Sequence, residues 1–475
     1  NDRGQITCLV FEKPSITDLG KQVLSNLYDP MWKNNADGSL DYRLAKNVDI
    51  SEDGTTYTLT LRDDIYWSDG EKITTDDIVF TLDTLAEPEV APSTATGYKV
   101  DGEFCTYEKV SDTEIVFTIG RASNLFKKAL GALYVLPAHC FEGVPATEVL
   151  TCEQNDTIAT SGAFVVDSFS VGEKLVCVKN DKYYRTPAHI DGFEVRCVSD
   201  AGTQEIAFQN GELSIFTISN AETLANYKDN ENYQVVSYPD GRITFLEINP
   251  NSEAMSTMEA REAVISALNL DELVYGTYGD ETLCRTATSI LSTVSMFYNP
   301  EITNYQQDLD KANELIEATG LKDKTIKIIY NSARVGQEEL ATMIKSQLDA
   351  VGLNVQIDSM ETAAYFKSYF YATDSYDIAG MLDDPSGFVG LFAHTRSGAN
   401  MYTTDEVDNM WVELDSEMDP AVRQTIMDNA ILALKDCWSC VPVLDTNYVC
   451  AAQANIGGFE NTDRLTDLTQ IYFIG

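Results

Sequence analysis

The segment that restricts the fold most strongly is Asp53–Asp83, DGTTYTLTLRDDIYWSDGEKITTDDIVFTLD. Its Asp53-Gly54 pair is a turn signal. Apolar residues then alternate with threonine over residues 56–61, which predicts a half-buried strand. Ser68-Asp69-Gly70 predicts the next turn. The first half of the segment therefore indicates a strand held between two turns.

A capped helix is expected after the second turn. Thr74 is a suitable N-cap, and Asp77, three residues later, completes the capping-box pattern. The carboxylates of Asp76 and Asp77 also lie in the first turn, where they stabilise the helix dipole. The apolar face of this helix consists of Ile78, Val79, Leu82 and Leu85. The segment contains no nucleophile paired with a base, no metal-ligand spacing and no phosphate-binding glycine pattern, so it predicts a structural joint.

Length and charge limit the class of protein. A chain of 475 residues is too long for one ordinary core and predicts two or more domains. With 33 Lys and Arg against 75 Asp and Glu, the net charge is −42. This balance argues against nucleic-acid binding, because phosphates need basic partners, and it repels an anionic membrane surface. The first residues, Asn1–Gly4, contain neither a basic leader nor an apolar core, so a signal segment is either absent or already removed.

The rest of the chain predicts a mixed α/β architecture. Residues 161–198 alternate between apolar and polar side chains in runs separated by glycine-containing turns, which favours strands. Residues 309–357 read as helix, strand, helix and strand, which predicts a parallel pair with a right-handed crossover. The loop Asn331–Arg334 inside this unit lacks the glycines that a dinucleotide site needs.

The ten cysteines do not form a recognisable metal or redox motif. Cys437-Trp438-Ser439-Cys440 is a lone CxxC that lacks the second ligand pair of a zinc site. It also follows a helical pattern, whereas a thioredoxin-like pair opens a helix. Cys177 and Cys197 lie in strand-like segments that pair as neighbours, so they are the best candidates for a disulfide. No metal site and no cofactor are expected.

In this context the opening segment resembles the diagnostic motif of the family 5 extracellular solute-binding proteins, the oligopeptide-, dipeptide- and nickel-type receptors of ABC importers. YVLPAHCFEG (134–143) is similar to the family's Pro-x-His segment, and SGAFVVDSF (161–169) to its Gly-x-Tyr strand, with Phe164 in place of Tyr. Further similar segments follow in the family's order: KNDKYYRTPAHIDGFEVR (179–196), AREAVISALNLDELV (260–274), MYTTDEVDNMWVELDSEMDPAVRQTIMDNA (401–430) and VPVLDTNYV (441–449).

The resemblance implies an α/β, two-lobed periplasmic-binding-protein-like fold of the large cluster, in which crossing strands join the lobes. Lobe I is expected over residues 1–39, 158–244 and 446–475, and lobe II over 245–445. An additional subdomain, residues 40–157, is expected to pack on lobe I. The ligand of such proteins lies between the lobes and is enclosed when they close. The opening segment then belongs to the scaffold of the additional subdomain.

The strongest site candidate is YDIAGMLDDPSGF, residues 376–388. In peptide-binding members a corresponding Gly-Trp-x-x-Asp-x-x-Asp-Pro region contributes an Asp that pairs with the α-ammonium of the peptide. Here Gly380 is followed by Met381 and the loop is shorter, so either Asp383 or Asp384 takes that role. An ammonium group enclosed in a cleft needs a carboxylate at hydrogen-bond distance to offset its desolvation. The alternative is an Asp-Asp-Pro turn that only bonds its own backbone.

Rough correspondence with the family places a few more residues at the ligand. Glu12 and Pro14 follow the first strand, and Tyr98 is also expected at the cleft. Arg242 lies where the chain crosses between lobes and has the geometry to pair with a ligand carboxylate. An ordinary half-buried aromatic is the alternative for Tyr98, and a hinge or surface ion pair is the alternative for Arg242.

The resemblance implies a receptor without catalytic activity that captures oligopeptides by lobe closure and passes them to the permease subunits of an ABC importer. It also implies a monomer at the cell surface or in the periplasm, attached through a lipid on a removed N-terminal segment. Metal chelates, haem, opines and oligosaccharides are alternative ligands for the same fold. A carboxylate-pair hydrolase is a remote alternative, since the sequence contains no GxSxG, HExxH or P-loop.

Overall fold

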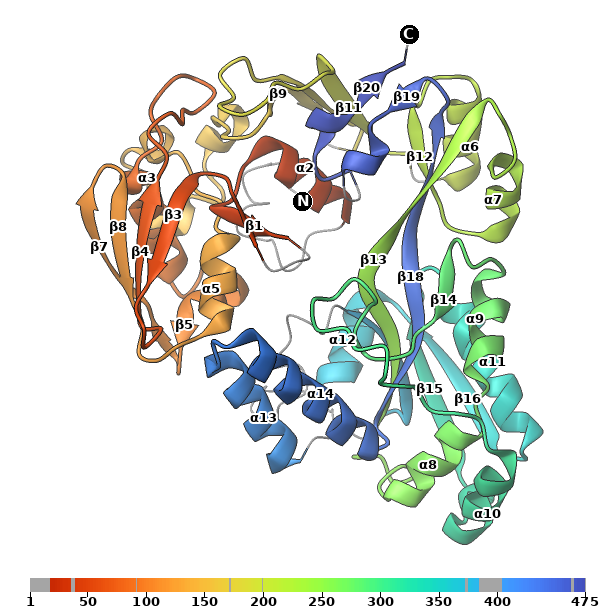
Figure 1. The fold of residues 1–475 in the computed structure, drawn as a ribbon. Helices are drawn as coiled ribbons and strands as arrows, with labels where there is room; N and C mark the ends of the chain where they lie inside the picture. The colour runs from red at the N-terminus through yellow and green to blue at the C-terminus, as the bar shows by residue number, and fades with distance from the viewer. Residues whose placement is uncertain are drawn as a thin grey trace. The chain divides into compact units, whose positions relative to one another are not determined.

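The computed structural model describes residues 18–35, 39–90, 92–170, 172–198, 200–371, 375–383, 404–462 and 465–474. The chain forms two compact units (Figure 1): unit 1 comprises Asn1–Phe216 and Ala452–Gly475, and unit 2 comprises Thr217–Ala451. The expected lobe boundaries, at 244/245 and 445/446, fall inside the long strands β13 (Tyr233–Ile248) and β18 (Cys440–Gln453). The division into two lobes and an additional subdomain at those residues therefore stays a prediction.

Unit 1 contains a four-stranded antiparallel sheet, which includes the strand predicted over residues 56–61. Its described strands follow the order β3-β4-β8-β7, with bounds β3 Ala45–Ile50, β4 Thr56–Leu61, β7 Thr106–Ser111 and β8 Glu114–Thr118. Strand β4 buries Tyr57, Leu59 and Leu61 and leaves the threonines between them half-buried, which confirms the predicted alternation. The ring of Phe126, on helix α5 (Asn124–Gly131), packs edge-on against Tyr57 with the ring centroids 5.0 Å apart.

Helix α3 (Thr75–Ala86) begins as the capping pattern predicts. The Thr74 hydroxyl accepts a hydrogen bond from the backbone N–H of Asp76, at 3.2 Å, and the Asp77 carboxylate accepts from the N–H of Thr74, at 2.9 Å. The second oxygen of Asp77 accepts from the N–H of Ala138, at 2.9 Å. This single buried carboxylate therefore caps α3 and also fixes η2 (Ala138–Phe141) to the start of the helix.

A second antiparallel sheet of unit 1, in the order β11-β10-β9, shows that the predicted disulfide is wrong. Its strands are β9 Phe164–Ser170, β10 Lys174–Lys179 and β11 Gly192–Arg196. The register places Cys177 opposite Phe193 of β11. The backbone N–H of Cys197 instead bonds to the carbonyl of Glu173, which lies four residues before Cys177 in the chain. Both thiols are free, one buried and one exposed, because the strand register keeps them apart.

Unit 1 also contains shorter elements. These are α2 (Asp18–Leu27), β1 (Trp32–Asn34), β2 (Leu40–Tyr42), α4 (Pro92–Ala95), η1 (Thr96–Tyr98), β5 (Lys99–Val100), β6 (Glu103–Phe104), η3 (Ala146–Glu148), η4 (Glu153–Thr157), α6 (Ala201–Gln209), β19 (Ile456–Gly457), η7 (Phe459–Asn461), η8 (Leu468–Gln470) and β20 (Tyr472–Phe473).

Unit 2 is built on a mixed sheet. Its described strands follow the order β12-β18-β13-β17-β15-β16, and β14 pairs with β18. Strand β15 is parallel to both β16 and β17, and β13 is antiparallel to β17. The remaining strand bounds are β12 Ile215–Ile218, β14 Cys284–Thr286, β15 Thr325–Asn331, β16 Asn354–Met360 and β17 Ile378–Asp383.

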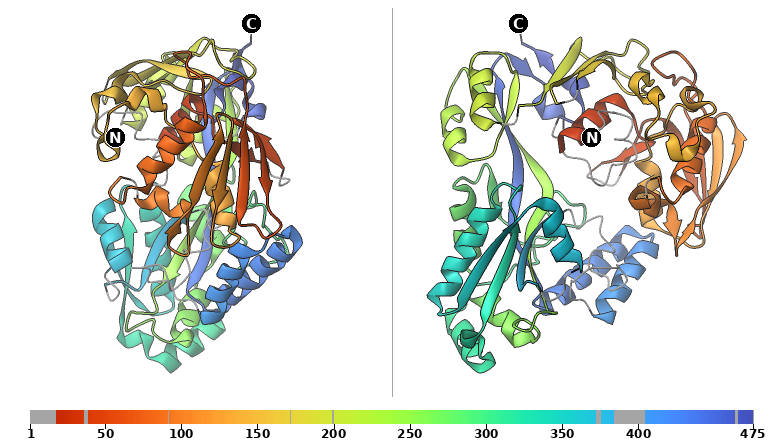
Figure 2. Two further views of the ribbon diagram at one scale, coloured as in Figure 1. Left: turned by 90° about the vertical axis from the view of Figure 1, so that its left-hand side faces the viewer. Right: turned by 180° about the vertical axis from the view of Figure 1, so that it is seen from behind.

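Helices cover both faces of this sheet (Figures 1 and 2). Leu246 of β13 and Ile328 of β15 lie in one hydrophobic core with residues of α8 to α11, and Phe245 and Ile329, their chain neighbours, lie in the other with residues of α12 to α14. The helices of unit 2 are α7 Ala221–Tyr227, α8 Met258–Ser266, α9 Leu270–Tyr278, α10 Leu309–Thr319, η5 Leu321–Asp323, α11 Gln337–Ala350, α12 Thr362–Tyr371, α13 Asp405–Ser416 and α14 Pro420–Asp436.

The predicted helix–strand–helix–strand unit is confirmed as α10, β15, α11 and β16. Gly320 ends α10 with a φ of 68°, a backbone conformation that favours glycine. Helix α11 is the crossover that returns the chain to lay β16 parallel to β15. In the part of the chain that the structure describes, none of the helices combines the length and the apolar character needed to cross a membrane.

Candidate functional site

Strand β17 carries the predicted site segment to the edge of the sheet in unit 2. Gly380 lies opposite Leu246 of β13, and Asp383, the last residue of β17, lies opposite Ile243. Because β15 and β16 are parallel to β17, their carboxyl ends, Asn331 and Met360, lie at this same edge. In open α/β sheets ligands bind outside the carboxyl ends of the strands. We refer to this region, formed by the ends of β15, β16 and β17, as the carboxyl edge.

Gly380 contacts side chains of two helices that pack onto β17. A Cβ atom at this position would lie 2.5 Å from Oε1 of Gln337, the first residue of α11. The hydroxyl of Tyr365, on α12, donates a hydrogen bond to the carbonyl of Gly380 at 2.5 Å. A side chain at position 380 would therefore require the end of the Gln337 side chain to move.

The loop after β15 is fixed by buried hydrogen bonds. The side-chain oxygen of Asn331, which is buried, accepts from the N–H of Ala333 and from the hydroxyl of Thr362, both at 3.1 Å. The N–H and the hydroxyl of Ser332 both donate to the carbonyl of Met360. These bonds join the ends of β15 and β16 and the start of α12 into one rigid corner.

Arg334 follows this corner and supplies a cation in the loop between β15 and α11. Its side chain is half-buried, and no carboxylate among the side chains that the structure describes forms an ion pair with it. Burial raises the pKa of Tyr365, and the positive charge of Arg334 opposes that rise. The sequence analysis missed Arg334, although a basic residue directly after a parallel strand is a signal that would have found it.

A buried carboxyl group lies behind the carboxyl edge, on β13. Glu247 is 1% exposed and pairs in register with Ala379 of β17. Its two carboxyl oxygens accept hydrogen bonds from the hydroxyls of Tyr369 and Tyr376, the latter at 3.2 Å. Burial raises the pKa of Glu247 from 4.5 to about 7, and the two tyrosine hydroxyls oppose this rise. This carboxyl group is therefore protonated over most of the acidic range.

The structure describes only some of the predicted ligand-contact residues. The backbones of Gly380, Met381 and Asp383 belong to β17, but the side chains of Met381 and Asp383 lie outside what the structure describes. Asp384, Glu12 and Pro14 lie outside the described residues altogether. The roles of these residues at a ligand stay predictions.

Arg242 is held by a neighbouring carboxylate on β13. Its Nη2 lies 2.8 Å from Oδ2 of Asp240, and its Nε bonds to both oxygens of the same carboxylate at 3.1 Å. The Asp240 carboxylate also accepts a hydrogen bond from the Thr446 hydroxyl, at 3.3 Å. This arrangement matches the ion pair that the sequence offered as the alternative to a ligand contact.

Tyr98 is part of the hydrophobic packing of unit 1. It lies in η1, is 4% exposed, and its hydroxyl donates to the carbonyl of Ala129 at 3.1 Å. Its ring packs against Phe104 with the centroids 6.1 Å apart. These contacts favour the alternative of an ordinary aromatic residue, although Tyr98 is buried instead of half-buried.

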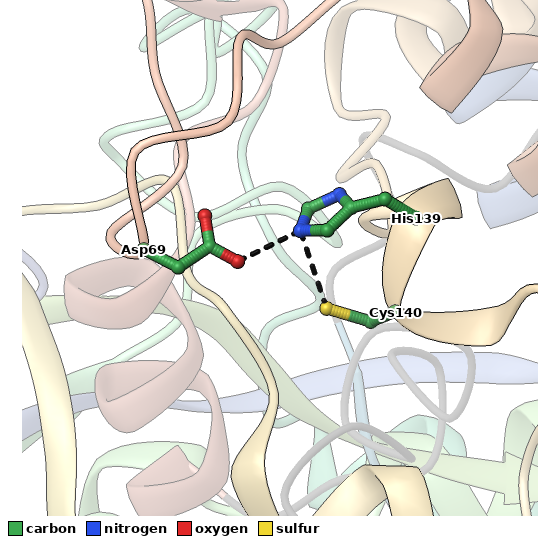
Figure 3. A group of neighbouring side chains, drawn as sticks. All are labelled: Asp69, His139 and Cys140. Atoms are coloured by element: carbon green, nitrogen blue, oxygen red, sulfur yellow. Dashed lines mark hydrogen bonds and ion pairs between the residues drawn. The ribbon is translucent and has the colours of Figure 1, made fainter.

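A second group of polar side chains lies in unit 1, at Asp69, His139 and Cys140 (Figure 3). Nε2 of His139 lies 2.7 Å from Oδ2 of Asp69 and 3.5 Å from Sγ of Cys140. One ligand atom from each residue falls within 4.8 Å of the other two. The sequence analysis missed this group because Asp69 and His139 are 70 positions apart.

Comparison with known proteins identifies the family. The model of the bacterial extracellular solute-binding proteins, family 5, matches residues 40–400. The oligopeptide-binding protein AppA of Bacillus subtilis is 21% identical over 375 residues, which cover 74% of this chain and 66% of that protein. The dipeptide-binding protein DppE of Bacillus subtilis is 22% identical over 482 residues, 94% of this chain and 87% of DppE.

The solved structure of AppA from Clostridium difficile has a TM-score of 0.89 and 26% identity, over 95% of this chain and 96% of that one. This likeness confirms the predicted two-lobed α/β fold class. The family match covers the opening segment and most of unit 2, and the fold agrees over nearly the whole chain. The chain belongs to the family 5 bacterial extracellular solute-binding proteins.

Proposed function

We propose that the protein is a receptor that captures oligopeptides and delivers them to an ABC importer. The relatives named above are an oligopeptide-binding and a dipeptide-binding protein, which supports peptides over metal chelates, haem, opines and oligosaccharides. Proteins of this kind bind their ligand and release it unchanged. Catalysis, including the remote carboxylate-pair hydrolase, is therefore not part of the proposal.

The observation that carries the proposal is the charge arrangement at the carboxyl edge. Strand β17 ends with Asp383 at this edge, and the loop after β15 carries the half-buried Arg334, which forms no ion pair with the carboxylates that the structure describes. A peptide carries an α-ammonium at one end and an α-carboxylate at the other. Each charged end needs an opposite charge when it leaves water, and we expect Asp383 or Asp384 to meet the ammonium and Arg334 to meet the carboxylate.

Recognition of the peptide between its ends is expected to use main-chain hydrogen bonds, which explains why the sequence shows no further side-chain motif. Capture is expected to occur by lobe closure, because a ligand that contacts both lobes only in the closed form shifts the balance toward closure. We expect a monomer that works outside the cell with permease subunits as partners and that is anchored by a lipid on a removed N-terminal segment.

Calorimetry with matched peptides tests the assignment of the two charges. We expect Asp383→Asn or Asp384→Asn to weaken binding of a free peptide at least tenfold, about 1.4 kcal/mol, and to have little effect on its N-acetylated form. Arg334→Gln is expected to weaken binding of the free peptide but not of its C-terminal amide. Arg196→Gln, which removes an exposed arginine of unit 1, is the control and should leave affinity unchanged.

Two results would contradict the proposal. Unchanged affinity in both aspartate variants would remove the ammonium site. Recovery of cleaved peptide after incubation would show an enzyme instead of a receptor. Native mass spectrometry of the purified protein, with identification of any co-purified peptide, gives a third and independent measurement.

A further inference from the structure

We propose that Asp69, His139 and Cys140 form a binding site for a divalent transition metal ion of the zinc class in unit 1 (Figure 3). The site is independent of the peptide-receptor function proposed above. It joins the turn that follows β4 to the segment η2, and it uses one oxygen, one nitrogen and one sulfur ligand.

The distances between the ligand atoms fit a tetrahedral ion. With Zn–N near 2.05 Å and Zn–S near 2.3 Å, tetrahedral angles place the nitrogen and sulfur about 3.5 Å apart. Nε2 of His139 and Sγ of Cys140 are 3.5 Å apart in the structure. The carboxylate of Asp69 is closer to Nε2, at 2.7 Å, because a hydrogen bond joins them. Metal binding replaces that bond and requires the carboxylate to move back by about 0.7 Å.

Both segments that carry the ligands are held in place without a metal ion. Oδ1 of Asp69 accepts a hydrogen bond from the N–H of Glu71, at 3.1 Å, which leaves the second oxygen directed at His139. The segment η2 is tied to helix α3 through the bond from the N–H of Ala138 to the buried carboxylate of Asp77. An ion therefore gains its ligands without ordering a loop, which lowers the cost of binding.

The ligand chemistry selects the kind of ion. A thiolate and an imidazole suit zinc and neighbouring transition metals, whereas magnesium and calcium prefer oxygen ligands only. The side chains of Asp69 and His139 are 42% and 31% exposed, so an ion has a path from solvent and a water molecule completes the fourth position. Binding removes the proton of the Cys140 thiol and releases it to solvent, because the thiolate is the ligand form.

A simple surface ion pair between Asp69 and His139 is the competing explanation, and it makes no use of Cys140. The two explanations differ in the effect of removing the sulfur. The test is titration of the chelator-treated full chain with Zn²⁺ against a chromophoric indicator, together with Co²⁺ spectra that report a thiolate-to-cobalt band. We expect one equivalent of Zn²⁺ to bind and the cobalt band to appear.

Variants with matched controls decide the assignment. Cys140→Ser, His139→Gln and Asp69→Asn are each expected to lower Zn²⁺ affinity at least tenfold, and Cys140→Ser to abolish the cobalt band. Cys197→Ser and His189→Gln, which change the same residue types elsewhere in unit 1, should bind as the unchanged protein does. Wild-type affinity in Cys140→Ser and His139→Gln, or no bound equivalent at all, would overturn the proposal. Circular dichroism tests whether each variant is folded. If the Cys140 variant does not fold, the Zn²⁺ affinity of Asp69→Asn provides the test instead.

Discussion

Glu247 is a carboxyl group that β13 buries completely between two tyrosine hydroxyls. Its pKa is about 7 in the folded protein against an ordinary value of 4.5. Between these two values the folded state binds a proton that the unfolded state has lost. The protonated Glu247 therefore contributes its full stabilisation of the folded state below pH 4.5, and this stabilisation is lost as the pH rises through 7.

We predict that Glu247→Gln removes this pH dependence. From pH 4.5 to pH 8, the free energy of unfolding of the unchanged protein should fall by about 3 kcal/mol more than that of the variant. Urea denaturation at a series of pH values measures this difference. Glu103→Gln, at an exposed position on β6, is the control and should follow the unchanged protein. A constant difference between Glu247→Gln and the unchanged protein across the range would contradict the raised pKa.

Helix α3 depends on a single carboxylate for two connections. Asp77 accepts the N–H of Thr74 at the helix start and the N–H of Ala138 in η2. The neighbouring Asp76 is exposed, and its carboxylate pairs with Lys109 on β7 at 2.7 Å. The two aspartates share a place in the first turn of the helix but differ in burial.

We predict that Asp77→Ala costs about 2–3 kcal/mol of stability, because it removes a cap and leaves the part-buried N–H of Ala138 without its acceptor. Asp76→Ala should cost at most about 1 kcal/mol, since an exposed ion pair contributes little. Chemical denaturation of both variants gives the comparison. Equal losses in the two variants would show that the capping box does not anchor the helix.

The strands of unit 2 set the position of the carboxyl edge. Asn331, Ser332 and Thr362 bond the ends of β15 and β16 to the start of α12, and Gly380 allows Gln337 and Tyr365 to pack on β17. A ligand contact at this edge would therefore be supported by three strands, β15, β16 and β17, and by two helices, α11 and α12. Rigid support of this kind improves affinity because little order is lost when the ligand binds.

For the molecule as a whole, the proposed closure makes a prediction about thermal unfolding. A peptide at about 100 times its dissociation constant stabilises the bound state by about 2.7 kcal/mol. For units of this size we expect a rise in Tm of about 5–10 °C. Because closure brings the ligand against both lobes, differential scanning calorimetry should show every unfolding transition shifting upward.

The same peptide with both ends blocked is the control and should shift the transitions much less. A peptide that stabilises one transition and leaves another unchanged would contradict closure, although it would still be compatible with binding at the carboxyl edge alone. The measurement therefore separates binding from the conformational step.

Local sequence patterns were sufficient to predict the secondary structure of three segments. The alternation in 56–61 and the capping box at Thr74 and Asp77 appear in the structure as predicted, and so does the crossover unit over 309–357. These features depend on residues within one turn or one strand of each other, so the chain encodes them locally. The family was also recognisable, because several such segments occur in a fixed order.

Contacts between distant positions were decided only by the tertiary structure. Strand register separates Cys177 from Cys197, packing of α12 onto β17 brings the Tyr365 hydroxyl to the carbonyl of Gly380, and the fold brings Asp69 to His139. The physical reason is that a register shift of a few residues, or a different helix packing, changes all of these distances without changing any local pattern. The amino-acid order therefore specified the elements and the family, whereas the side chains that meet at each site depended on how those elements pack.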